Sequence, residues 1–188
     1  MEPRFIVVEG PDGAGKSEIV QRVAESLDFT PYKTPPEEYR RIRDYFDLPT
    51  TDPMSRFFFY TAGICDASRD ISLMLKSTGV VSDRYTHSLL IYHELLTRKN
   101  LRGIIDNLDI IKPDVTIILN AEPSVLEGRI RERRPTSDRE LERRSDFMLA
   151  VNRKFSSIRG RDVVHIDTSH TSIEGAHQKC LNNLLRLV

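Results

Sequence analysis

An octapeptide near the start of the chain has the residue types and spacing of a phosphate-binding loop. Residues 10–17 read Gly-Pro-Asp-Gly-Ala-Gly-Lys-Ser, which fits the pattern G-x-x-x-x-G-K-[ST]. Backbone N–H groups of such a loop converge on phosphate oxygens, and the following helix N-terminus adds positive potential. The three glycines permit the turn and a close approach of backbone to phosphate. Lys16 is expected to reach the outer phosphates of a nucleotide, and the Ser17 hydroxyl to hold Mg²⁺.

The flanking residues favour nucleotide binding over a glycine-rich turn without a ligand. Residues 5–8 form an apolar, strand-like run directly before the loop, and residues 18–27 are compatible with a helix directly after it. A strand, loop and helix in this order is the context that this motif requires.

A second candidate site is the tripeptide Asp83-Arg84-Tyr85, which follows the apolar residues Val80 and Val81. A carboxylate at the end of a buried strand near a phosphate loop can hold Mg²⁺ or accept a proton from an attacking group. Arg84 can clamp an acceptor phosphate through two parallel hydrogen bonds. The alternative is an ordinary surface ion pair, and the place after a strand favours the functional interpretation.

Arginine is dense between residues 129 and 144, where seven arginines against four acids leave a local net charge of +3. Pro135-Thr136-Ser137 interrupts the helical pattern in the middle. One interpretation is a mobile lid that closes over ATP and brings an arginine onto the transferring phosphoryl group. The other is a solvated helix pair with i,i+4 ion pairs.

Three further groups of residues could carry chemistry, but none of them forms a specific motif. Lys33 ends a weak strand, where it can meet a phosphate or remain exposed. The aromatic run of residues 57–60 is typical of a helix in the core, with one member free to stack on a planar substrate. The five histidines show no metal-ligand spacing, and we assign them no role.

Composition indicates an ordinary cytoplasmic enzyme. The chain has 188 residues and a formal net charge of zero, so nothing global indicates binding to nucleic acid or to a membrane. Cys65 and Cys180 lie far apart without a pairing pattern, which favours a reducing compartment. The N-terminus carries charges among its apolar residues, unlike a signal peptide, and no apolar run is long enough to span a membrane.

The sequence predicts an α/β fold in one domain over residues 1–188. The expected strands are Arg4–Glu9, Phe29–Lys33, Val80–Asp83, Val115–Asn120 and Val163–Asp167. Helical patterns cover about residues 16–27, 36–46, 53–76, 86–98, 101–110, 123–134, 138–158 and 172–187. This alternation indicates a parallel sheet with helices on both faces, and ligands gather at the carboxyl ends of such strands.

Taken together, these motifs resemble the thymidylate kinase family of P-loop nucleoside monophosphate kinases, nearly from end to end. The segments that carry the resemblance are EGPDGAGKS, VVSDRYTHSLLIY, PDVTIILNAEPSVLEGRIRERR, SDRELE and HIDTS. The resemblance implies a three-layer P-loop kinase fold with a five-stranded parallel sheet and an arginine-rich lid at about residues 131–143. It also implies ATP and Mg²⁺ as cofactors, a small-molecule phosphate acceptor and a homodimer.

The resemblance further implies roles for individual residues. Those expected at ATP are Gly10, Asp12, Gly13, Ala14, Gly15, Lys16, Ser17, Arg129 and Arg133. Those expected at the acceptor are Asp12, Lys33, Tyr60, Ile64, Arg84, Ser88, Leu89 and Tyr92. Mg²⁺ would be held by Ser17 and Asp83, and the catalytic set would be Lys16, Asp83, Arg84 and Arg139. The phosphate loop carries no basic residue before Gly15, as in members whose catalytic arginine comes from the lid.

The chain departs from the family at the base-binding positions. The family's segment R-E-P-G-G after the second strand reads Lys-Thr-Pro-Pro-Glu at residues 33–37. Tyr60 keeps the aromatic residue that lies on the thymine face, but Ile64 stands at the arginine that contacts the thymine carbonyl. Leu89 replaces a polar base-contacting residue. Each unpaired polar group of a buried thymine would cost about 1–3 kcal/mol, so dTMP is a doubtful acceptor.

Three functions compete at this point. Arg84 and Lys33 favour a nucleoside monophosphate kinase, because a phosphorylated acceptor needs cations. Loss of the base-reading arginine favours a kinase of a nucleoside or another small alcohol, with Asp83 as the base. A regulatory nucleotide-binding module is the third, although the N-K-x-D guanine motif of GTPases is absent. The glycine spacing argues against a dinucleotide dehydrogenase.

Overall fold

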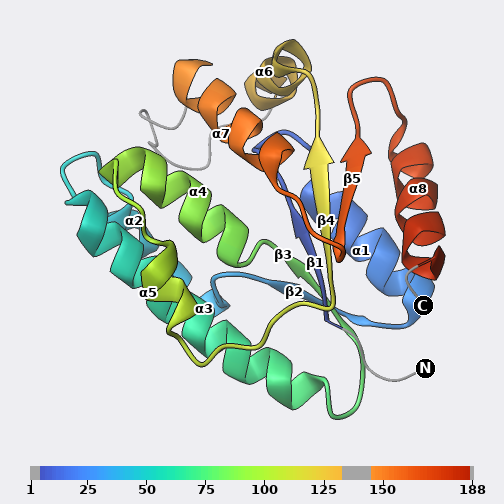
Figure 1. Cartoon of the computed structure of the whole chain (residues 1–188), viewed down its shortest axis with the longest axis horizontal. Helices are drawn as coiled ribbons and strands as arrows, with labels where there is room; N and C mark the ends of the chain where they lie inside the picture. Colours follow the sequence, from blue (N-terminus) through green and yellow to red (C-terminus); the bar gives the residue numbers. More distant parts are fainter. Residues whose placement is uncertain (1–4, 133–144, 187–188) are drawn as a thin grey trace.

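The computed structural model describes residues 5–132 and 145–186. Within them, five parallel strands form one sheet, as the sequence predicted, and their order is β2-β3-β1-β4-β5 (Figure 1). The strands are β1 (Phe5–Glu9), β2 (Thr30–Lys33), β3 (Val80–Asp83), β4 (Val115–Asn120) and β5 (Val163–Asp167). The last three have the predicted bounds, and β2 begins one residue later than predicted.

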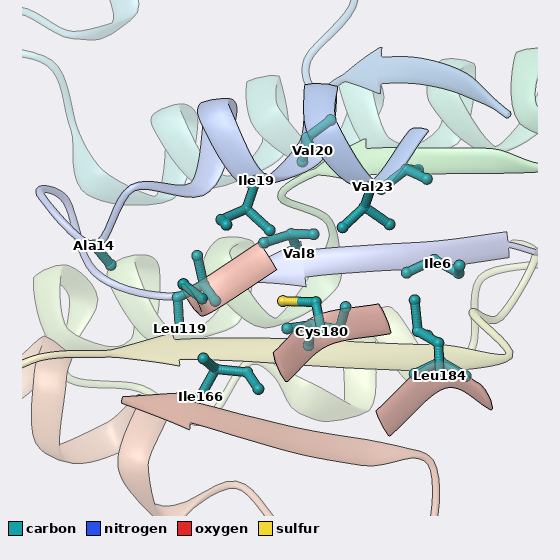
Figure 2. Packing of buried hydrophobic residues seen from close by; sticks show 14 of the residues in the cluster. Ile6, Val8, Ala14, Ile19, Val20, Val23, Leu119, Ile166, Cys180 and Leu184 are labelled. Carbon is teal, nitrogen blue, oxygen red and sulfur yellow. The ribbon is translucent and has the colours of Figure 1, made fainter. Parts of the chain in front are cut away.

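One face of the sheet is covered by α1 (Lys16–Leu27) and α8 (Ile173–Arg186). Alternate residues of β1, Ile6 and Val8, point to this face, as the two-residue period of a strand requires. Figure 2 shows Ile19 and Val23 of α1 packed against them. This packing holds the start of α1 directly beyond the end of β1, where the phosphate loop connects the two elements.

The opposite face is covered by α3 (Pro53–Met74), α4 (Thr86–Thr97) and α7 (Ser145–Ser157) (Figure 1). Phe5 and Val7 of β1 belong to this core, together with residues of α3 and α4. The helix α3 begins where the Asp52 carboxylate accepts hydrogen bonds from the N–H groups of Met54 and Ser55, both at 3.0 Å.

Shorter elements complete the described part of the chain. The helix predicted over residues 36–46 is split into a 3₁₀ turn, η1 (Glu37–Tyr39), and α2 (Arg40–Phe46). The helix predicted over residues 101–110 is reduced to α5 (Arg102–Asp106), and α6 (Pro123–Glu132) begins as predicted. Residues 133, 134, 138–144 and 187 of the predicted helices lie outside the described residues. No helix in the described ranges has the length and apolar character needed to cross a membrane.

Gly10 shows why the phosphate loop begins with glycine. Its φ of 144° lies in the region that side chains rarely adopt, and a Cβ atom there would lie 2.3 Å from the Leu119 carbonyl oxygen of β4. Only a residue without a side chain lets the chain leave β1 this close to β4. The loop is therefore positioned by the sheet itself.

Candidate active site

A cavity of about 310 Å³ opens at the carboxyl ends of β1, β2 and β3, beside the start of α1. All eight residues that the sequence suggested for the acceptor line it: Asp12, Lys33, Tyr60, Ile64, Arg84, Ser88, Leu89 and Tyr92. Lys16, Ser17 and Asp83 line the same cavity. The donor and acceptor parts of the predicted site therefore share one space, while the role of each residue stays a prediction.

The phosphate loop presents a buried lysine and an uncapped helix end. Lys16 is 7% exposed, and its Nζ donates a hydrogen bond of 2.7 Å to the Pro11 carbonyl oxygen. Burial and, to a smaller extent, the nearby Arg84 guanidinium lower the pKa of Lys16 to about 8, against the raising effect of Asp12. Gly15 precedes α1 in a left-handed conformation, and no side chain caps the helix. An anion bound at this helix end would gain the Lys16 ammonium group and the uncapped backbone N–H groups of α1 as partners.

Ser17 and Asp83 form the group of oxygen atoms that the sequence proposed for Mg²⁺. The Ser17 hydroxyl donates to Asp83 Oδ2 at 2.6 Å. Asp83 is buried, and its other oxygen, Oδ1, has no hydrogen-bond partner among the described residues. Hard oxygen ligands are those that Mg²⁺ prefers, so this pair fits the ion chemically.

The backbone at Arg84 holds an unusual conformation beside the loop. Arg84 has a φ of 73°, which is uncommon for a residue with a side chain. Its carbonyl oxygen accepts hydrogen bonds from the hydroxyls of Ser82 and Thr34, both at 2.9 Å. Its N–H donates to the Val8 carbonyl oxygen at 3.0 Å. Such local strain persists only where surrounding contacts enforce it, and it concentrates at functional sites.

The Arg84 guanidinium is held on three sides. Nη1 donates to Ser88 Oγ at 2.8 Å and to the Gly10 carbonyl oxygen at 3.3 Å, and Nη2 donates to the Asp12 carboxylate. Burial opposes the charge of Arg84, but Asp12 and the Tyr92 hydroxyl outweigh it, so the pKa of Arg84 is raised. The Tyr92 ring centre lies 5.4 Å from the guanidinium carbon. A planar cation is thus fixed in the cavity wall.

Glu9 completes this support, and the sequence analysis gave it no role. It is completely buried, and its Oε1 accepts hydrogen bonds from the N–H groups of Tyr85 at 2.8 Å and Ser88 at 3.1 Å. Its Oε2 accepts from the Ser88 hydroxyl. Glu9 therefore caps α4 from another element and orients the hydroxyl that contacts Arg84. The signal in the sequence that could have marked Glu9 is its charge at the end of an otherwise apolar strand.

Arg129 connects the phosphate loop to the loop after β5. Its Nη1 donates to Thr168 Oγ1 at 3.1 Å and to the Gly13 carbonyl oxygen at 3.4 Å, and Nη2 donates to the Thr168 carbonyl oxygen at 2.7 Å. Arg129 thus holds the phosphate loop at Gly13, whereas Arg84 contacts it at Gly10 and Asp12. Contact of Arg129 with ATP stays a prediction.

Comparison with known proteins decides the family. A sequence model of the thymidylate kinase family matches residues 8–180. The chain belongs to the thymidylate kinase family. It is 32% identical over 197 aligned positions to the thymidylate kinase of Baumannia cicadellinicola, an alignment that covers 93% of this chain and 88% of the relative. Membership makes the chain an ATP-dependent kinase of the nucleoside monophosphate type.

Two solved structures share the fold. Thymidylate kinase from Candida albicans superimposes with a TM-score of 0.81 at 16% identity, covering 98% of this chain and 92% of that chain. Deoxyadenosine kinase from M. mycoides superimposes with a TM-score of 0.71 at 18% identity, covering 96% and 98%. The all-parallel five-stranded sheet of the described residues is thus the sheet of the family.

The lid that the resemblance implies for a thymidylate kinase family member falls largely outside the described residues. Arg133 and Arg139 lie there, as does nearly all of the expected lid at about residues 131–143. Arg131, at the end of α6, is exposed and lies 3.7 Å from the Glu127 carboxylate, which is the solvated i,i+4 pair expected in the alternative interpretation.

The aromatic run of α3, residues 57–60, is divided between the core and the cavity wall. Phe57 and Phe59 are buried, Phe58 is 53% exposed, and Tyr60 is half-buried in the cavity wall. Two of the four rings are therefore core, and Tyr60 alone of the run lines the cavity. Its hydroxyl donates to Asp47 Oδ1 at 2.8 Å.

Two polar residues for which no motif predicted a role, Arg43 and His93, also line the cavity. Arg43 of α2 donates through Nε to Asp47 Oδ2 at 3.0 Å and to the Tyr60 hydroxyl at 3.1 Å. His93 of α4 is 4% exposed, and its Nδ1 lies 2.8 Å from the Leu89 carbonyl oxygen. Burial lowers the pKa of His93 to about 4, and the charge of Arg56 contributes. Neither residue stands in a motif, so no sequence signal marked it.

The buried His93 gives a pH-dependent prediction. Between about pH 6.5, the ordinary pKa of histidine, and pH 4, the unfolded chain binds more protons than the native protein, so stability falls as pH is lowered. From about pH 7.5 to about pH 5, the wild-type protein should lose about 2 kcal/mol more unfolding free energy than His93→Phe. Urea denaturation at both pH values measures this, and equal losses in the two proteins would contradict a buried neutral histidine.

Proposed function

We propose that the chain transfers the γ-phosphate of ATP, bound with Mg²⁺, to a nucleoside monophosphate in the cavity beside Arg84. The observation that supports this most is the fixed Arg84 guanidinium in the same cavity as Lys16. A phosphorylated acceptor needs a cation with parallel hydrogen-bond donors beside the phosphate loop, whereas a neutral acceptor does not.

In this proposal the phosphate loop binds the donor. Lys16 exchanges its bond to the Pro11 carbonyl for bonds to phosphate oxygens, and the start of α1 contributes backbone N–H groups. Ser17 and Asp83 hold Mg²⁺, whose contribution is to neutralise charge on the phosphate oxygens. Arg84 exchanges part of its contact with Asp12 for the acceptor phosphate, which leaves Asp12 available to a sugar hydroxyl.

A second candidate function has one observation in its favour. The Asp83 Oδ1 atom is buried without a hydrogen-bond partner among the described residues, and such an atom can accept a proton from an attacking hydroxyl. A kinase of a nucleoside or another small alcohol would use Asp83 in this way. If Asp83 Oδ1 binds Mg²⁺, it cannot also accept a proton. The identity of the phosphate acceptor therefore distinguishes the two functions.

An ADP-release assay with ATP and Mg²⁺ tests the proposal across dTMP, dCMP, dAMP, dGMP and the four matching nucleosides. Stimulation by one or more monophosphates and by no nucleoside is expected. Stimulation by nucleosides alone would select the second candidate, and no stimulation by any of the eight would contradict the proposed function and leave only a different small alcohol as the acceptor. Because Ile64 and Leu89 remain at the base positions, dTMP should give kcat/KM below about 10⁵ M⁻¹s⁻¹, at the lower end of ordinary enzymes. A homodimer stays a prediction from the resemblance.

A further inference from the structure

The part of the cavity formed by Tyr60, Ile64 and Leu89 is not wholly apolar, because two other helices add polar groups. Arg43 from α2 contacts the Tyr60 hydroxyl through Nε at 3.1 Å. The ring centres of Tyr60 and His93 lie 5.4 Å apart. Arg43, Tyr60 and His93 are therefore neighbours in one wall, although they come from three different helices.

Arg43 is an anchored cation with unused donors. Its Nε is committed to the Tyr60 hydroxyl and to Asp47, which is only 6% exposed. Its two terminal nitrogens, Nη1 and Nη2, bond to no atom of the described residues, and the side chain is about one-third exposed. A guanidinium offers donors only. Because the Asp47 bond already fixes its position, Arg43 can present these donors to a ligand at little entropic cost.

His93 supplies the opposite kind of group. The Leu89 carbonyl can only accept a hydrogen bond, so Nδ1 carries the proton in their 2.8 Å contact, and Nε2 is left as an acceptor. Nε2 is buried without a hydrogen-bond partner in the described part of the chain. Buried polar atoms are nearly always paired in native proteins, and an exception in a cavity wall indicates an absent partner.

We propose that Arg43 and His93 recognise the base of the acceptor nucleotide. Arg43 donates from its terminal nitrogens to a carbonyl or ring nitrogen of the base, and His93 Nε2 accepts from a base N–H, with the Tyr60 ring between them. Every nucleobase carries an acceptor next to an N–H donor, so Arg43 and His93 rank the bases by where these groups lie, with thymine disfavoured by the apolar Ile64 and Leu89. This inference rests on the proposed function and adds the residues that choose the base.

The test compares four variants on dTMP, dCMP, dAMP and dGMP at saturating ATP and Mg²⁺. His93→Leu and Arg43→Met should each raise KM for the preferred acceptor about 10- to 100-fold, with kcat and the KM of ATP nearly unchanged. His93→Gln, which retains an acceptor oxygen, and Arg43→Lys, which retains a charged donor, should recover part of the loss. The ranking of the four bases should flatten in His93→Leu and Arg43→Met.

Matched controls are available on other surfaces. His177 is also a buried histidine whose Nδ1 has no hydrogen-bond partner among the described residues, with Glu174 Oε1 at 3.7 Å, but it lies on α8 and does not line the cavity. Arg22 on α1 is paired with Glu18 at 2.8 Å and also lies outside the cavity. His177→Leu and Arg22→Met should leave the acceptor KM and the base ranking within about twofold of wild type.

Thermal unfolding distinguishes recognition from packing. If His93 only fills space, His93→Leu removes an unpaired polar atom and leaves both Tm and acceptor KM at least as good as in wild type. Unchanged KM and unchanged base ranking in both His93→Leu and Arg43→Met would overturn the inference while leaving the proposed function standing. A wild-type enzyme that phosphorylates none of the four nucleotides would overturn the proposed function and this inference together.

Discussion

Replacing Lys16 with alanine is expected to lower kcat/KM for phosphoryl transfer by about a thousandfold or more, with the fold retained. Lys16 is the buried cation of the phosphate loop, and its bond to the Pro11 carbonyl holds it beside the uncapped start of α1. A fixed charge in a site that excludes water stabilises developing phosphate charge far more than an exposed charge does. Removing it should therefore affect the reaction more than any other single change.

The same change should leave stability nearly intact. The pKa of Lys16 is lowered to about 8, mainly by burial, which means that the native protein does not favour this charge. Loss of the side chain should therefore leave the circular dichroism spectrum and Tm close to wild type. Lys112→Ala, at an exposed lysine before β4, is the matched control and should retain full activity. Wild-type turnover by Lys16→Ala would refute the assignment of the phosphate loop.

Arg84→Met should lower kcat/KM for a monophosphate acceptor by about a hundred- to a thousandfold, mainly through KM of the acceptor. Methionine keeps much of the volume but removes the donors that Arg84 directs at Gly10, Ser88 and Asp12. Arg84→Lys should be intermediate, since an ammonium group keeps the charge and loses the planar pair of donors. Steady-state kinetics with the acceptor varied at saturating ATP measures both effects.

Arg98→Met is a matched control for Arg84→Met, because the same substitution is made at another arginine with a positive φ. Arg98 also has a positive φ, of 56°, but it is exposed at the end of α4 and outside the cavity. Its replacement should leave the kinetics unchanged, so a loss confined to Arg84→Met cannot come from strain at a left-handed residue. If Arg84→Met kept the acceptor KM of wild type, the acceptor would not be held by its phosphate at Arg84.

The charged residues around the cavity are costly for the fold and useful for the reaction. Glu9 is fully buried, Lys16 and Asp83 are nearly so, and Arg84 is held against Asp12. Burying charges costs free energy that close pairing only partly recovers. Their concentration at the ends of β1 and β3, the two neighbouring strands at the centre of the site, is the pattern expected where function overrides stability.

Local patterns in the sequence determined the phosphate loop and most of the sheet. Val80–Asp83, Val115–Asn120 and Val163–Asp167 were predicted with the bounds that the structure shows, because each begins with an apolar run, the longest of them in the buried strand Val115–Asn120. Helix α1 was predicted exactly as well, since it follows the loop directly. Helix α5 was predicted too long, and the 3₁₀ turn before α2 was missed.

The tertiary structure decided which polar groups meet in the acceptor cavity. Glu9 and Ser88 are 79 positions apart, yet they form one hydrogen-bonded unit behind Arg84. Arg43 and His93 belong to no motif, and the periodicity of their helices indicates only which face is buried. Contacts between such side chains depend on how α2, α3 and α4 pack on one another, which no local pattern records. The sequence by itself therefore determined the residues of the phosphate loop, while packing alone decided which polar groups line the rest of the cavity.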